Sequence, residues 1–107
     1  MDAHGGRAMQ RLTVMANSRD RTHHHSLATE VLARARHAHL AGATVVAGME
    51  GLGHSGVLHR RHVFGEDVPL AIVIVDEGSK IQAFVEASRD ALGDALVIVE
   101  DVTAFRA

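Results

Sequence analysis

The sequence predicts a small α+β domain in which two helices cover one face of a four-stranded antiparallel sheet. Two segments carry apolar residues at helical spacing, and four others are β-branched or alternate in polarity as strands do. Their order along the chain is β-α-β-β-α-β. With 107 residues, the chain has room for one such domain and no more.

The N-terminal part of the chain predicts a tail and the first strand. Residues 1 to 8 are small and polar, so we expect a disordered tail followed by a single domain over 9 to 107. The segment from 10 to 16 places Leu12 and Val14 on one face and carries β-branched residues, which is typical of a strand. The polar run NSRDRTHHHS after it predicts a loop.

A first helix is predicted from Ser26 to about Leu40. Ser26 is a good N-cap, apolar residues recur at helical spacing after it, and Gly42 follows where the helix should stop. Glu30 and Arg34 are one helical turn apart, in the favourable order. We expect this pair on the solvent-facing side of the helix.

The second half of the chain predicts three strands and a helix. The runs AGATVVAGMEG, PLAIVIVD and ALVIVEDV predict the strands, and Pro69 stands at the first position of its strand, where it removes no interior ladder bond. A helix with Ser79 and Gln82 spaced as a capping box and Gly93 as its end separates the last two strands. This order of elements is that of the ferredoxin-like fold.

The last two predicted strands are apolar on both faces. LAIVIV and ALVIV are apolar at consecutive positions, whereas the two helices of a ferredoxin-like domain cover one face of the sheet only. An uncovered apolar face is unusual on a soluble monomer. We therefore expect a second copy of the chain to bury it, and a closed ring of identical subunits does so most simply.

Composition excludes several classes of function. The formal charge of −2, with nine histidines neutral, provides no general basic field for nucleic acid or an anionic membrane. The absence of Cys excludes disulfides and thiolate chemistry. The chain lacks an N-terminal signal and any apolar run of roughly 18 residues, so a cytoplasmic protein is expected. No nucleophile with its base and no phosphate-binding GxxxxGK[ST] motif is present, so we do not expect an enzyme.

A polar, glycine-rich segment, GMEGLGHSGVLHRRHVFGEDVP, joins the second and third predicted strands. The backbone at Gly51 and Gly53 can approach an anion closely, although a β-bulge or a strand exit explains these glycines equally well. His59, Arg60 and Arg61 are suited to pairing with carboxylate or phosphate. A solvated loop is the alternative interpretation.

Two further clusters of polar residues have competing interpretations. His23, His24 and His25 suggest a metal site, but consecutive side chains do not converge easily, so a polar loop is favoured and His23 with His25 remains the alternative metal pair. Glu100 and Asp101 point to opposite faces of a strand and cannot form a catalytic dyad. We expect them in capping or in an intersubunit ion pair, with Arg106 as the partner.

An ordered set of residues over 10 to 107 resembles one known family. The set comprises AGATV at 41 to 45, Gly48, Glu50-Gly51-x-Gly53, His59, Asp67-x-Pro69, Val75-Asp76, Lys80-Ile81, Phe84, Glu100-Asp101-Val102 and Arg106. With it, the chain resembles the PII-like proteins of domain-of-unknown-function family 190, relatives of the nitrogen-signalling PII trimers. The resemblance implies a homotrimer of ferredoxin-like subunits in which residues 51 to 66 form the T-loop, a flexible reporter element with glycine hinges.

The same resemblance implies a regulator that binds an adenine nucleotide or another small anion between subunits and signals to a partner, for example a membrane transport protein. The ligand-binding residues it favours are Gly51, Gly53, His59, Arg60, Arg61 and Arg106. The segment 92 to 94 lacks the lysine of nitrogen-signalling PII proteins, so ATP is expected to bind weakly and a smaller or singly phosphorylated ligand is favoured. A trimeric, metal-binding protein similar to the copper-tolerance CutA proteins is the alternative.

Overall fold

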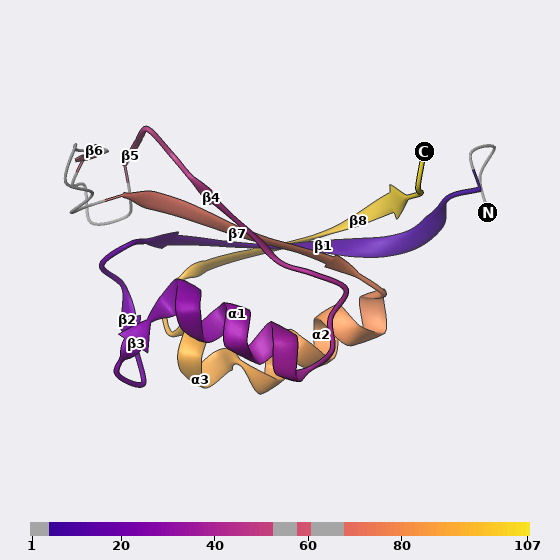
Figure 1. Cartoon of the computed structure of the whole chain (residues 1–107), viewed down its shortest axis with the longest axis horizontal. Helices are drawn as coiled ribbons and strands as arrows, with labels where there is room; N and C mark the ends of the chain where they lie inside the picture. Colours follow the sequence, from indigo (N-terminus) through magenta and orange to yellow (C-terminus); the bar gives the residue numbers. More distant parts are fainter. Residues whose placement is uncertain (1–4, 53–57, 61–67) are drawn as a thin grey trace.

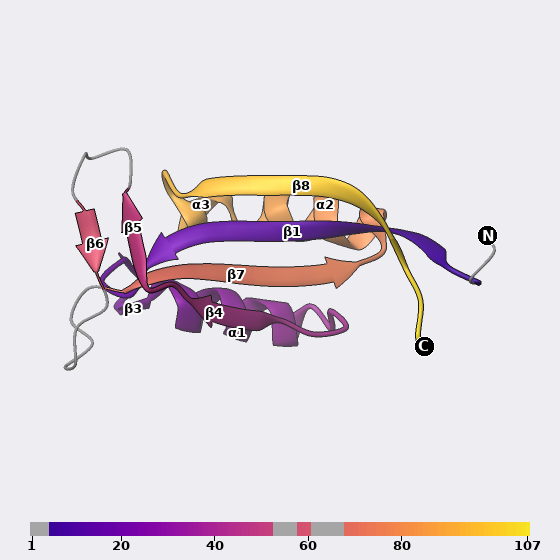
Figure 2. The same ribbon diagram turned by 90° about the horizontal axis from the view of Figure 1, so that it is seen from above.

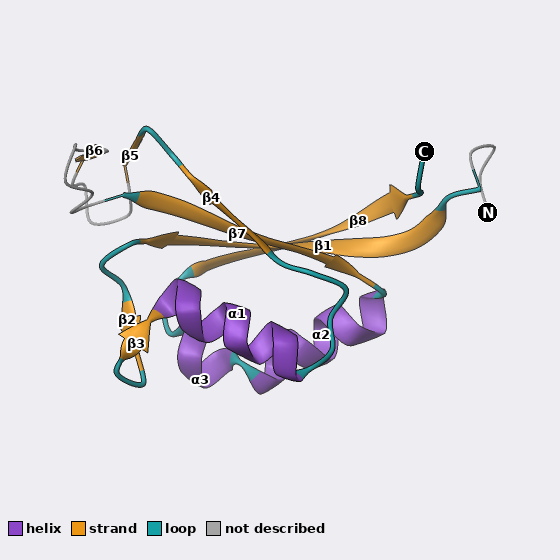
Figure 3. Cartoon of the chain, viewed as in Figure 1, coloured by secondary structure: helices purple, strands orange, loops and turns teal. Residues whose placement is uncertain are grey.

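The computed structural model describes residues 5–52, 58–60 and 68–107 of the chain. Its elements are β1 (Arg7–Asn17), β2 (Arg21–Thr22), β3 (His25–Ser26), α1 (Leu27–His37), β4 (Thr44–Ala47), β5 (Glu50–Leu52), β6 (Leu58–Arg60), β7 (Pro69–Asp76), α2 (Gly78–Ala87), α3 (Arg89–Leu92) and β8 (Leu96–Ala104). The long strands and the helices follow the predicted β-α-β-β-α-β order (Figure 3). The predicted fold class is therefore confirmed.

The main sheet has the strand order β4-β7-β1-β8, with every neighbouring pair antiparallel. The central strand β1 places Leu12 opposite Ile74 of β7 and opposite Val99 of β8. All three helices lie on one side of this sheet (Figure 1). Seen from above, α1 lies behind β7 and β4, whereas α2 and α3 lie behind β8 and β1 (Figure 2).

The core lies between the sheet and the helices. Alternate residues of the two central strands point into it, because successive side chains of a strand face opposite sides. Leu12, Val14 and Ile72 are completely buried there, and Ile74 is 1% exposed. The helices complete the core with Leu27, Val31, Ala35, Ile81, Phe84 and Leu92.

The other face of the sheet has no helix over it in the described structure (Figure 1). It presents Met15, Val46, Leu96 and Ile98, which are 43%, 52%, 63% and 40% exposed. Met15 of β1 stands opposite Leu96 of β8 on one side and opposite Ala71 of β7 on the other, and Ala71 in turn stands opposite Val46 of β4. These side chains therefore form one continuous surface. The prediction of an uncovered apolar face is confirmed.

Several element ends differ from the sequence prediction, and the predicted strand AGATVVAGMEG is reduced to β4, with its last two residues in the separate strand β5. Strand β1 begins at Arg7 rather than at residue 10, because Arg7 and Ala8 pair with the end of β8, so these two residues do not belong to a tail. Helix α1 ends at His37, three residues early. The left-handed residue after it is His39 at φ 57°, and not Gly42, and the Leu40 N–H closes the turn on the Ala35 carbonyl.

The second helical region is divided in two. Helix α2 begins at Gly78 with Glu77 as an N-cap that makes no side-chain bond, so the predicted capping box of Ser79 and Gln82 is wrong. Gln82 instead donates to the side chain of Gln10 at 2.9 Å. The helix breaks at Ser88, and α3 then ends before Gly93, whose φ of 59° confirms its predicted role as the stop.

A buried carboxylate joins the two crossover connections. Asp76, at the end of β7, is 4% exposed. One of its oxygens accepts the Ala41 N–H at 2.8 Å and the other accepts the Glu77 N–H at 2.7 Å. The turn after α1 and the start of α2 are therefore fastened to the same side chain, which satisfies two backbone donors that burial would otherwise penalise.

Candidate ligand site at the base of the central loop

The strands that lead into and out of the central segment, β4 and β7, meet at a close contact. The Gly48 N–H donates to the Pro69 carbonyl at 2.7 Å. A Cβ atom at position 48 would lie 3.0 Å from Pro69 Cγ, closer than almost all real Cβ contacts. A residue with a Cβ atom at position 48 would require the Pro69 ring to shift by a few tenths of an ångström, so glycine favours this close approach.

The end of β1 reinforces the same region. The Ser18 N–H donates to the Val68 carbonyl at 2.8 Å, and the Val68 N–H donates to Ser18 Oγ at 2.9 Å. Asn17 pairs with Pro69 across the ladder, and its Nδ2 is buried without an acceptor among the residues that the structure describes. We call Asn17, Ser18, Gly48, Val68 and Pro69 the loop base. The contributions of Asn17 and Ser18 were not predicted from the sequence.

A short antiparallel ladder follows the loop base. Strands β5 and β6 pair Glu50 with Arg60, Gly51 with His59 and Leu52 with Leu58. Three residues of the predicted ligand site, Gly51, His59 and Arg60, thus belong to one two-stranded ladder, whereas the sequence predicted a loop for His59 and Arg60. The other two from this segment, Gly53 and Arg61, lie outside the described residues.

The remaining predicted ligand residue, Arg106, lies at the other end of the molecule. In both views the C-terminus and the β5–β6 ladder are at opposite ends of the sheet (Figures 1 and 2). One chain therefore does not bring Arg106 to Gly51, His59 and Arg60. A site that contains all of them requires two copies of the chain.

The acidic pair in β8 has other partners than the predicted Arg106. Arg11 Nε lies 2.8 Å from Glu100 Oε1, and Gln10 Nε2 donates to Asp101 Oδ1 at 3.0 Å. The ladder explains this choice, because Arg11 stands opposite Glu100 and Gln10 opposite Asp101. The hydrogen bond from Arg11 lowers the pKa of Glu100.

The consecutive histidines form a tight turn. His23 and His24 connect β2 to β3, and both have positive φ, 48° and 69°. His23 Nε2 lies 3.0 Å from Asp90 Oδ2 of α3, which draws this ring to the helix layer. The described part of the chain contains no group of three His, Cys, Asp or Glu residues that could hold a metal ion.

An ion-pair cluster links this turn to both helical segments. Arg34 Nε lies 2.8 Å from Glu30 Oε2, and the two terminal nitrogens of Arg34 lie 2.8 and 2.9 Å from the two carboxylate oxygens of Asp90. The bidentate bond from Arg34, with a smaller contribution from His23, holds the pKa of Asp90 far below its usual range. The expected pairing of Glu30 with Arg34 is confirmed, but the pair is largely covered and not on the solvent-facing side.

The model of family DUF190, described as "Uncharacterized ACR", matches residues 9–104. The chain belongs to this family. No helix in the described parts of this DUF190 protein is both long and apolar enough to cross a membrane.

Solved structures of PII-like proteins share the fold of this DUF190 chain. CPII of Thiomonas intermedia K12, a nitrogen regulatory PII-like protein bound to ADP, AMP and bicarbonate, superposes with a TM-score of 0.70 at 20% identity, covering 97% of this chain and 94% of CPII. A PII-like signaling protein of Thermus thermophilus gives a TM-score of 0.67 at 15% identity, covering 91% and 89%. CutA of Synechococcus elongatus PCC7942 gives 0.56 at 10% identity, covering 91% and 80%.

Proposed function

We propose that this chain is the subunit of a homotrimeric PII-like regulator that binds an adenine nucleotide between subunits and reports its presence through residues 51 to 66. The observation that carries the assembly is the uncovered apolar face of the sheet, formed by Met15, Val46, Leu96 and Ile98. Burying such a face removes a large apolar area from water, at about 25 cal/mol per Å². A ring of identical subunits buries it in every copy.

The ligand site is proposed at the contact of two subunits, where the loop base and the β5–β6 ladder of one subunit meet the C-terminal end of another. The separation of Arg106 from Gly51, His59 and Arg60 within one chain supports a shared site. A shared site also makes ligand binding and assembly interdependent, because a ligand that contacts two subunits stabilises their contact.

The proposed ligand is an adenosine mono- or diphosphate, with a small anion such as bicarbonate as a second ligand. CPII, which has this fold, was solved with ADP, AMP and bicarbonate. In this chain the segment Leu92-Gly93-Asp94 offers no lysine to a third phosphate, and Asp94 adds a negative charge there. We therefore expect ADP and AMP to bind more tightly than ATP.

The partner that receives the signal is proposed to be a protein that contacts residues 51 to 66, with a membrane transport protein as the first candidate. The hydrogen bonds from Gly48 to Pro69 and between Ser18 and Val68 support this arrangement, because they fix the two ends of the segment. A ligand bound beside fixed ends can bias the path of the chain between them.

A thermal-shift screen tests the ligand assignment. A ligand at 100 times its Kd stabilises the folded protein by about 2.7 kcal/mol, so ADP, AMP, ATP and bicarbonate are compared with Zn²⁺ and Cu²⁺. We expect ADP or AMP to stabilise the folded protein. The variants Arg61→Ala and Arg106→Ala should bind this nucleotide about 10- to 150-fold more weakly. The control Arg36→Ala, which changes an exposed arginine of α1, should bind it with unchanged affinity. Stabilisation by metal alone, abolished by His23→Ala or His25→Ala, would replace the proposal with the CutA-like alternative.

A further inference from the structure

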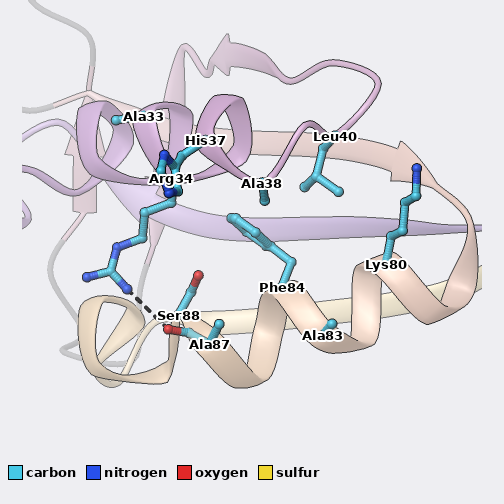
Figure 4. A pocket seen from close by; sticks show the side chains of 10 residues that line it. All are labelled: Ala33, Arg34, His37, Ala38, Leu40, Lys80, Ala83, Phe84, Ala87 and Ser88. Atoms are coloured by element: carbon cyan, nitrogen blue, oxygen red, sulfur yellow. Dashed lines mark hydrogen bonds between the residues drawn. The ribbon is translucent and has the colours of Figure 1, made fainter.

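A groove of about 560 Å³ lies between α1 and α2, on the helix layer and away from the loop base (Figure 4). Its walls are mainly apolar and are formed by Ala33, Ala38, Leu40, Ala83, Phe84 and Ala87. All of these residues belong to the described parts of the chain. A volume of this size is within the usual range for small-molecule sites, roughly 300 to 1,000 Å³.

The groove exists because α1 is bound to α3 near one end, through Arg34 and Asp90, whereas the facing positions of α1 and α2 beyond this contact are mostly alanine. Helix α1 packs on the sheet, and its main contact with another helix is with α3, where Arg34 binds Asp90 and donates to the Ala87 carbonyl at 3.3 Å. Ala33, Ala83 and Ala87 are exposed and have no side chain beyond Cβ to fill the space. Phe84, only 4% exposed, forms the floor (Figure 4).

The ionisable side chains that line the groove are all basic residue types. Lys80 lies at one end, and Arg34 and His37 lie near the other (Figure 4). Arg34 is engaged by Glu30 and Asp90, whereas Lys80 makes no ion pair with the described residues. No carboxylate belongs to the lining, and Glu77, three residues before Lys80, is paired with Arg7, so an anionic group beside Lys80 meets a net attraction.

The shape of the apolar part matches a linear ligand. Lys80, Ala83, Phe84 and Ala87 lie along one side of α2, and the distance from Lys80 to Ala87 along the helix axis is about 10 Å at 1.5 Å per residue. An extended alkyl chain of medium length laid along this stripe covers Phe84 and both alanines. Its terminal carboxylate then lies at the Lys80 end.

We propose that the groove is a second binding site, which takes a small amphiphilic anion of the alkyl carboxylate class. The alkyl chain packs on Phe84 between Ala83 and Ala87, and the carboxylate pairs with Lys80. The site is on the opposite side of the sheet from the proposed subunit contact, so it remains open in the assembled protein (Figure 1). It is independent of the nucleotide site.

Titration of the intact protein with decanoate, followed by NMR of labelled alanine methyl groups and by calorimetry, tests this site. We expect saturable shifts at Ala33, Ala83 and Ala87 below the micelle concentration. Ala83→Leu and Ala87→Leu fill the groove and should weaken binding at least about tenfold, because an occupied site has no room for the chain. Ser79→Leu, at an exposed α2 position outside the lining, is the matched control and should bind as the parent does.

Charge selectivity is measured with a decyltrimethylammonium ion and with Lys80→Ala. Exposed ion pairs are weak, so Lys80→Ala should reduce decanoate affinity by about two- to fivefold, while Arg36→Ala leaves it unchanged. Equal binding of the cation and the carboxylate overturns the anion assignment. If decanoate still binds to the Ala83→Leu and Ala87→Leu variants, the proposed site is wrong. The proposal is also wrong if decanoate does not bind to the parent protein but an acidic amphipathic peptide does. It is wrong as well if decanoate does not bind and the leucine variants change the oligomeric state, because the groove is then a contact between subunits.

Discussion

The two faces of the main sheet are built from alternate residues of the same strands, yet only one of them is covered by helices. On one face Leu12, Val14 and Ile72 are fully buried beneath the chain's own helices. On the other, Leu96 and Ile98 are as apolar but lie 63% and 40% exposed. The covered face stabilises the single subunit, whereas the open face is the surface that we propose for contacts between subunits.

The largest effect is expected from a cavity in the covered face. Ile72→Ala removes a buried side chain from the centre of the core and should lower the free energy of unfolding by about 2 to 5 kcal/mol. Denaturant unfolding measures this change. Val73→Ala, on the open face, is the control and should cost clearly less when both variants are compared in dissociated subunits; an equal loss would break the distinction between the faces.

A charge on the open face should act on assembly and leave the subunit folded. Ile98→Glu places a carboxylate within the apolar surface, and we expect the subunit dissociation constant to rise at least about tenfold with an unchanged circular dichroism spectrum. Sedimentation velocity measures the dissociation. The control is Leu32→Glu, which adds the same charge to an exposed apolar position of α1. A wild-type protein that is monomeric at micromolar concentration contradicts the proposed assembly.

A substitution in the turn at His23 and His24, on the helix side of the sheet, should stabilise the subunit. His24 has φ 69°, which glycine adopts without steric cost and other residues do not. His24→Gly relieves this cost of about 1 to 2 kcal/mol but adds freedom to the unfolded chain, so it should raise the free energy of unfolding by a net of about 0.5 to 1 kcal/mol without altering assembly. His25→Gly places glycine in β3 instead and should destabilise. If both changes destabilise, the left-handed conformation of His24 carries no strain.

The smallest expected effect is pH-dependent and comes from Asp90. Its pKa is lower in the folded chain than in the unfolded chain, where it is about 3.9, because Arg34 stabilises the carboxylate. This stabilisation is complete above about pH 4 to 5 and is lost as the pH falls. Asp90→Asn should therefore be less stable than the parent at pH 6, and the difference should shrink by pH 3.

Asp94→Asn provides the control for that measurement, since Asp94 is an exposed aspartate just after α3. The pH dependence of the Asp90→Asn stability difference is measured against that of Asp94→Asn. Because about half of the Asp90 side chain is exposed, solvent screens the pair and keeps the effect modest. A difference that grows towards low pH would contradict the assignment of the lowered pKa to Asp90.

Local patterns predicted the architecture well, because strand and helix periodicities reflect burial against a single core. Ser26 was correctly identified as the N-cap of α1, where its Oγ accepts the Thr29 N–H. Local sequence patterns gave wrong predictions where residues distant in the sequence form the hydrogen bonds or ion pairs. Ser79 does not cap α2, since Asp76 already binds the Glu77 N–H, and Arg34 is turned to Asp90, 56 residues away in the sequence.

The candidate site was less predictable than the fold. Gly51, His59 and Arg60 were recognised from residue type, but their pairing in the β5–β6 ladder and the support from Asn17 and Ser18 depend on contacts across the loop base. The α1–α2 groove was missed because alanine at an exposed helical position is ordinary in sequence. Only the packing of α1 against α3 leaves those alanines facing an open space.

The buried carboxylate of Asp76 has a consequence for how genetic variants of this protein should be interpreted. It fastens the Ala41 N–H, three residues before the edge strand β4 begins, and β4 leads directly to Gly48 at the loop base. A substitution such as Asp76→Ala frees that connection and allows the edge strand to fray. In a screen for loss of the proposed signalling, such a variant would mimic a defect of the loop itself, although Asp76 is at the far end of β7 from the loop base.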